Sequence, residues 1–164
     1  MKFISSILLL LFTFLGTSAQ EKPLTKELEH WSNGNKKVEG WYSNTDATGK
    51  WTWWFANGNK KMEGFFDYGV GQGKWTWYHM NGNKMQEGKY KVGIKTGEWL
   101  AWHLNGQQLV AGNMADGRYH GKFTFYYDWG ELKRVEMYEK GVLLETTYLH
   151  PKLKESEDKD KIPF

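Results

Sequence analysis

Aromatic and polar residues alternate along much of this chain, and the alternation returns at a fixed interval. Residues 49–72 begin Gly-Lys-Trp-Thr-Trp-Trp, pass through Asn-Gly-Asn and continue to Glu-Gly. Further copies begin at Gly73, Gly97 and Gly121, each 24 residues after the one before, without insertion or deletion. Alternation with a period of two is typical of β-strands, and a fixed period of this length predicts a repeat architecture.

Each copy predicts a β-hairpin that turns at an Asn-Gly pair, such as Asn57-Gly58 or Asn81-Gly82. The flanking stretches are rich in Trp, Tyr, Phe and Thr, which favour strands. Asn-Gly favours a two-residue type I′ turn, because both central residues of that turn need a positive φ. The fourth copy has Trp129 in place of the turn Asn, so we expect a different turn there, in a terminal cap.

A two-residue turn also sets the pairing of the strands in each hairpin. In this register Trp54 faces Lys61 and Trp51 faces Gly64. The Trp51 ring is then expected to cover the backbone that the opposite glycine leaves exposed. The same pair of Trp and Gly recurs in the next two copies, which supports the register.

Alternation assigns the side chains to two faces of the predicted sheet. Trp51 and Trp53 share a face with the composition of a core, whereas Lys50 and Glu63 lie on the opposite, polar face. One aromatic column runs across that polar face, and it provides the candidate binding residues Trp54, Tyr78, Trp102 and Tyr126. Such a column either binds a partner or holds neighbouring strands together, and both roles stay open.

A second, glycine-containing turn, exemplified by residues 67–72, joins each hairpin to the next. Short connections of this kind make neighbouring strands antiparallel. The predicted fold is therefore all-β: a single-layer, twisted, antiparallel meander of tandem 24-residue β-hairpin repeats with roughly ten strands. Most of the stability of such an array comes from contacts between neighbouring repeats.

The ends of the chain differ in composition from the repeats. Lys2, an apolar run over residues 4–15 and small residues before Gln20 are the features of a cleaved secretory signal. We therefore expect a periplasmic or secreted protein. The predicted parts are a signal peptide (1–19), a polar lead-in (20–29), the repeat sheet (30–149) and a charged, disordered tail (150–164).

The composition argues against several kinds of function. The sequence has no Cys, so neither disulfides nor thiolate metal sites form. The formal net charge of +3 is too small to predict a nucleic acid partner. His79 and His103 occupy equivalent positions two strands apart, about 9–10 Å, which is too far for both to bind one zinc ion. No metal site and no cofactor are expected.

The search for catalytic residues also argues against an enzyme. Glu63 and Glu87 repeat in phase, but we expect them to pair across strands with Thr52 and Thr76. The sequence contains no nucleophile elbow, zinc-protease helix motif, P-loop or dinucleotide fingerprint. We therefore predict a protein without catalytic residues.

The repeat unit is carried most clearly by residues 73–78 (Gly-Lys-Trp-Thr-Trp-Tyr), 81–84 (Asn-Gly-Asn-Lys) and 87–88 (Glu-Gly). Over residues 30–149 it resembles the MORN repeat (membrane occupation and recognition nexus) in its bacterial variant form. The resemblance implies a sheet of hairpins without catalytic residues. It also implies a role in protein scaffolding or lipid contact, or in a toxin–antitoxin system, because bacterial proteins of this kind are often labelled antitoxins.

Taken together, these features predict an exported, non-catalytic binding or scaffolding module that presents its sheet to a protein or cell-envelope partner. One alternative is the antitoxin component of a toxin–antitoxin system. Another is a carbohydrate-binding module that takes a polysaccharide on the aromatic column.

Overall fold

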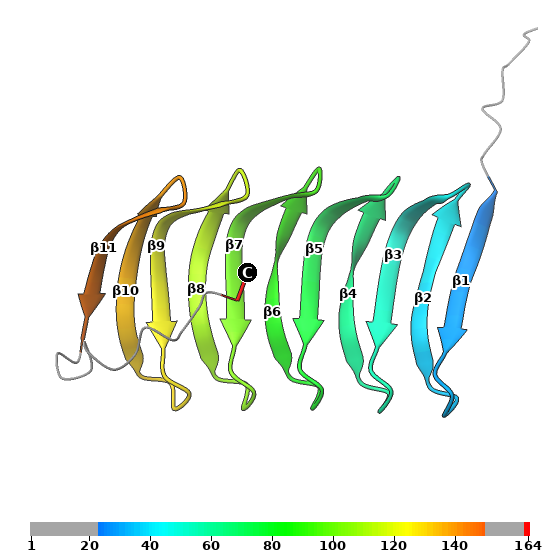
Figure 1. The fold of residues 1–164 in the computed structure, drawn as a ribbon, viewed down its shortest axis with the longest axis horizontal. Coiled ribbons are helices and arrows are strands. Elements are labelled where there is room, and N and C mark those ends of the chain that lie inside the picture. Colours follow the sequence, from blue (N-terminus) through cyan, green and yellow to red (C-terminus); the bar gives the residue numbers. More distant parts are fainter. Residues whose placement is uncertain (1–22, 150–162) are drawn as a thin grey trace, which may run out of the picture.

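The computed structural model describes residues 23–149 and 163–164 and shows one open sheet (Figure 1). Eleven strands lie side by side in chain order, and each pair of neighbours is antiparallel. The predicted all-β, single-layer meander of hairpins is confirmed. The strands are β1 (Leu24–His30), β2 (Lys36–Ser43), β3 (Asp46–Trp54), β4 (Lys60–Asp67), β5 (Val70–Tyr78), β6 (Lys84–Lys91), β7 (Ile94–Trp102), β8 (Gln108–Ala115), β9 (Arg118–Tyr126), β10 (Leu132–Glu139) and β11 (Val142–Tyr148).

The sheet begins earlier than the sequence indicated. β1 falls largely within the segment predicted as a polar lead-in, residues 20–29, and pairs with β2 along its whole length. Its residues are mostly polar and exposed, so the aromatic alternation of the other strands is absent from it. The predicted signal peptide, residues 1–19, lies outside the described residues. Within the described part, no helix is long and apolar enough to cross a membrane.

The Asn-Gly turns differ from the prediction. The Phe55 amide donates to the Asn59 carbonyl over 2.8 Å, and the Gly58 amide donates to the Phe55 carbonyl over 3.0 Å. Only Gly58 has a positive φ, 89°, so this is a type I turn followed by a glycine bulge rather than a type I′ turn. The extra residue places Trp54 opposite Lys60, so the predicted pairing with Lys61 is wrong.

The fourth copy forms the same turn as the others, so the different turn expected there is also wrong. The Gly130 amide donates to the Tyr127 carbonyl over 2.9 Å, and Gly130 has a φ of 94°. Trp129 precedes this glycine and is not among the residues with positive φ. A bulky residue is therefore tolerated at its position. Two-residue turns with positive φ at both positions lie at the opposite ends of the strands, at 68–69, 92–93, 116–117 and 140–141.

Strand glycines make room for tryptophan rings. The register places Trp51 opposite Gly64 and Trp75 opposite Gly88, as predicted. The rings, however, lie toward the preceding hairpin. A Cβ atom on Gly64 would fall within the ring of Trp75, and one on Gly88 within the ring of Trp99. A β-bulge at these glycines shifts the register between hairpins and admits the ring. The expectation that each ring covers the glycine opposite it in its own hairpin is therefore wrong.

These rings form a continuous column on one side of the sheet, which we call the Trp face; the other side is the polar face. Consecutive ring centroids in the column are 5.6–6.1 Å apart, a spacing typical of favourable aromatic pairs. The column leads into the most deeply buried part of the sheet. The column is Trp51, Trp53, Trp75, Trp77 and Trp99, and the buried cluster is Trp99, Ala101, Val110, Met114, Phe123 and Phe125.

Phe164 corrects one part of the tail prediction. The sequence assigned residues 150–164 to a disordered tail, but the Phe164 ring lies 5.6 Å from Trp99 and 6.3 Å from Phe123. An aromatic ring at the end of a charged segment has apolar area to bury, which the composition of the whole segment concealed. Residues 150–162 lie outside the described residues, and the prediction for them stays a prediction.

Asparagine side chains join each repeat to the next. The Nδ2 atoms of Asn57 and Asn59 both donate to the carbonyl of Met80, each over 2.9 Å. Asn81 and Asn83 donate in the same way to a carbonyl one repeat further on, that of Leu104. The Asn-Gly-Asn motif therefore lies in the turn and also links each repeat to the next.

Candidate functional site

The four candidate binding residues stand at the ends of alternate strands. Trp54, Tyr78, Trp102 and Tyr126 are the last residues of β3, β5, β7 and β9, and all four are half-buried. Equivalent residues two strands apart are separated by about 10 Å. Consistent with this spacing, no ring contact joins the four to one another in the described part of the chain. They form a spaced column rather than a cluster.

Charged neighbours hold three of these rings in place. The Lys36 ammonium lies 5.4 Å from the centre of the Trp54 ring, and the Lys84 ammonium lies 5.3 Å from that of Trp102. The Tyr78 hydroxyl donates a 2.7 Å hydrogen bond to Glu63. These contacts cross from one hairpin to the next, so the rings act at least in part as links between strands.

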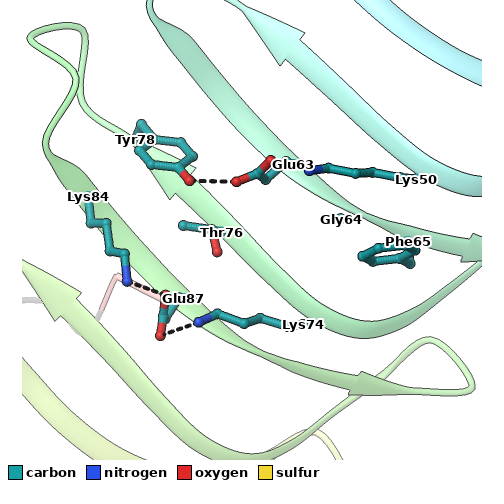
Figure 2. A pocket seen from close by; sticks show the side chains of 9 residues that line it. All are labelled: Lys50, Glu63, Gly64, Phe65, Lys74, Thr76, Tyr78, Lys84 and Glu87. Carbon is teal, nitrogen blue, oxygen red and sulfur yellow. Dashed lines mark hydrogen bonds and ion pairs between the residues drawn. The ribbon is translucent and has the colours of Figure 1, made fainter.

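Glu63 is the centre of a charged group on the polar face (Figure 2). Its carboxylate accepts contacts from Lys50 at 2.8 Å and Lys60 at 3.0 Å, besides the bond from Tyr78. Partial burial raises the pKa of Glu63, but the hydrogen bonds from Lys50, Tyr78 and Lys60 outweigh it and lower the pKa to about 2. Burial and the neighbouring carboxylate raise the pKa of Tyr78.

The same arrangement of one Glu between two Lys occurs in three successive repeats. Thr52 is opposite Glu63 and Thr76 is opposite Glu87, as predicted, but the carboxylates reach lysines rather than the threonine hydroxyls. The series then ends, because Ala111 takes the next equivalent position. We call these groups the Lys–Glu–Lys clusters: Lys26–Glu39–Lys36, Lys50–Glu63–Lys60 and Lys74–Glu87–Lys84.

Two exposed aromatic residues lie directly beside these clusters. Trp41 is 40% exposed and stands opposite Lys26; Phe65 is 47% exposed and stands opposite Lys50. Phe65 lines a shallow pocket together with Glu63 and the neighbouring lysines (Figure 2). Sequence analysis missed both rings. The available signal was an aromatic residue at an outward position that recurs 24 residues later.

The lysines beside Glu63 and Glu87 disfavour a role of these two carboxyl groups as general acids. A general acid needs a raised pKa, whereas the pKa of Glu87 is lowered, since hydrogen bonds from Lys84 and Lys74 outweigh the effect of burial. The two in-phase histidines bind the backbone: Nε2 of His79 and of His103 lie 3.0 and 3.1 Å from carbonyls of the next repeat. Within residues 23–149 and 163–164, no group of His, Asp and Glu is arranged to hold a metal ion.

Comparison with known proteins adds no assignment. No family model matches this chain, and no curated protein matches it. The resemblance to the MORN repeat therefore stays a prediction.

Proposed function

We propose that this protein is a non-catalytic binding or scaffolding module that presents the polar face of its sheet to a protein or cell-envelope partner. The observation that carries the proposal is the pairing of exposed rings with fixed charges. The rings of Trp41 and Phe65 are exposed on a surface on which ion pairs already join the lysines and glutamates of the Lys–Glu–Lys clusters.

Such a surface favours binding for two physical reasons. Exposed Trp and Phe rings release free energy when a partner covers them, and interface energy concentrates in a few large side chains. The lysines and glutamates already pair with one another, which reduces the side-chain freedom that is lost when they meet a partner. Because hydrogen bonds join all eleven strands, the rings stay at fixed positions relative to each other.

The test removes the two exposed rings and leaves the sheet intact. The chain and its Trp41→Ser/Phe65→Ser variant serve as baits in cell-envelope extract, and each captured component is identified and its affinity measured. We expect the variant to lose about tenfold or more in affinity, as for the loss of an interface hot spot. Tyr68→Ser/Trp129→Ser is the matched control, since both rings are exposed but lie in turns. Equal binding by chain and variant contradicts the proposal.

Carbohydrate binding is a second candidate, favoured by the same two rings. Trp41 and Phe65 occupy equivalent positions two strands apart, about 10 Å. Flat rings at regular intervals suit the apolar faces of sugars along an extended chain. A glycan array probed with the same chain and variants separates the candidates: retention of a polysaccharide that is lost in Trp41→Ser/Phe65→Ser identifies a sugar ligand.

A further inference from the structure

At one position of the aromatic column on the Trp face, the strands of the sheet supply no aromatic ring. Trp77 stands between Trp75 and Trp99, with its ring centroid 5.9 Å from the first and 6.0 Å from the second. The equivalent residue of the next repeat is Ala101, which is fully buried but has no ring. The repeat pattern therefore leaves a space between Trp99 and Phe123.

Phe164 fills that space. Its ring lies 5.6 Å from Trp99 with a tilt of 42°, and 6.3 Å from Phe123 with a tilt of 33°. These values resemble the spacing and tilt of the column's own neighbours, such as the 6.0 Å and 32° between Trp77 and Trp99. The end of the chain marked in Figure 1 accordingly lies over β7, the strand that carries Trp99.

The site also holds the main chain of its occupant. The Tyr119 hydroxyl donates a 2.5 Å hydrogen bond to the main-chain oxygen of Phe164. The two rings meet edge to face, with centroids 6.4 Å apart and an angle of 81°. A tilted ring on each side, an edge contact and a donor to the main-chain oxygen together select an aromatic residue of a peptide.

Phe164 is not part of the sheet that it completes. It follows Tyr119 by 45 residues, and no strand of the sheet contains it. Phe164 is tethered by the chain but sits in the site through non-covalent contacts alone, so a competitor that makes the same contacts displaces it when its concentration exceeds the effective concentration of the tethered ring. The other rings of the column, by contrast, belong to hydrogen-bonded strands and cannot leave singly.

We propose that the space at Ala101 is a binding site for an aromatic residue of a peptide, and that Phe164 occupies it from within the same chain. A partner peptide with an aromatic residue binds there by displacing Phe164. This site lies on the Trp face, opposite the surface proposed above for partner binding. A negative result for one site therefore leaves the other proposal unaffected.

The test uses two peptides and three forms of the full chain. The peptides are Lys-Ile-Pro-Phe, the sequence of residues 161–164, and Lys-Ile-Pro-Ala as its control. The proteins are the natural chain, Phe164→Ala, and Ala101→Trp/Phe164→Ala, in which a ring from the sheet itself fills the space. Binding is followed by NMR through the indole N–H resonances of a ¹⁵N-labelled protein, with Trp99 as the reporter.

We expect Lys-Ile-Pro-Phe to shift the Trp99 resonance of Phe164→Ala saturably. The natural chain should bind it about tenfold or more weakly, because its site is open only for the fraction of time that Phe164 is out. Neither the Ala peptide nor the protein with Trp at position 101 should give the shift. Equal binding by all three proteins, or equal binding of both peptides, overturns the proposal.

A melting experiment covers the case in which Phe164→Ala is too unstable for titration. Phe164→Ala should lower the melting temperature of the natural chain but leave that of Ala101→Trp unchanged, because the new ring has already taken the space. An equal decrease in both backgrounds places Phe164 elsewhere and overturns the assignment. Dimers of the natural chain that Phe164→Ala abolishes would also overturn it, since they assign the ring to a second copy.

Discussion

At the scale of single residues, this sheet depends on glycines that leave space for a neighbouring ring. Gly40, Gly64, Gly88 and Gly112 all lie where an added Cβ would fall within an aromatic ring. The fourth copy, which has no glycine at this position, also has no ring to accommodate. The fourth copy has Glu136 at the glycine position, and the next strand has Thr147 where the other repeats have Trp or Phe. Without a ring to accommodate, a large side chain fits, and Glu136 instead accepts hydrogen bonds from Arg134 and Tyr138.

This contact gives a test of which ring lies over which glycine. Gly88→Ala should destabilise the protein by about 1–3 kcal/mol, because the new methyl group must displace the ring of Trp99. Most of that loss should vanish in a Trp99→Leu background and persist in a Trp75→Leu background. Chemical denaturation of the natural chain, the three single variants and the two double variants measures the coupling. Lys89→Leu, an exposed neighbour on the polar face, is the control and should change stability little. Coupling of Gly88 to Trp75 instead would contradict the assignment.

At the scale of strands and turns, the sequence predicted the faces and the central register but not the turns. Strict alternation decides which side chains share a face, so the positions of Trp51, Thr52 and Glu63 followed from the pattern. Asn-Gly, however, suits both a type I′ turn and a type I turn with a glycine bulge. The second Asn of the motif does not decide between them, because Gln107 and Glu131 stand at its position in turns with the same hydrogen bonds. Where it is present, its side chain donates to the next repeat. A contact between repeats has no signature within a single hairpin.

The candidate site was predictable only in part for a similar reason. The column at Trp54 and Tyr78 followed from alternation, whereas its lysine and glutamate partners depend on side-chain reach across two hairpins. The local signal for Phe164 was weak, a single aromatic ring at the end of a charged segment. Its position depends on the absence of a ring at Ala101. That absence becomes meaningful only when the structure shows that the rings of the other repeats form one continuous column.

The Lys–Glu–Lys clusters predict how the hairpins respond to acid. The pKa of Glu63 is about 2 in the folded protein, below its ordinary value of 4.5, and that of Glu87 is also lowered. The folded state therefore binds fewer protons than the unfolded state, so these groups stabilise the fold above about pH 4.5. The stabilisation is lost as the pH falls from there toward the folded-state pKa, about 2 for Glu63.

Glu63→Gln/Glu87→Gln should accordingly be less stable than the natural chain at pH 7 and should lose less stability between pH 5 and pH 3. Urea denaturation at a series of pH values measures both effects. Glu139→Gln is the control, since that side chain is exposed at the end of β10, and its acid response should match that of the natural chain. Parallel pH curves for the double variant and the natural chain would show that the clusters contribute nothing to the acid response.

At the scale of the whole molecule, each strand is hydrogen-bonded only to the strands before and after it. An array of this kind gains stability repeat by repeat, and its fold does not depend on a particular number of repeats. Deletion of residues 73–96, one complete repeat, should therefore leave a shorter folded sheet with a lower melting temperature. Gly97 then follows Gln72 in phase, and the ring of Trp99 meets Gly64 as Trp75 did.

The matched control removes half as much chain but breaks the phase. Deletion of residues 73–84 joins Gln72 to Met85, so that a strand with the composition of β6 follows β4 directly. The glycine at position 64 then loses its ring, and Asn57 and Asn59 lose the carbonyl that they bind. We expect circular dichroism and a cooperative melt to report a folded sheet for the longer, in-phase deletion and loss of the cooperative melt for the shorter one. If both deletion variants fold equally well, the ring contacts and Asn hydrogen bonds between repeats contribute little to the stability of the fold.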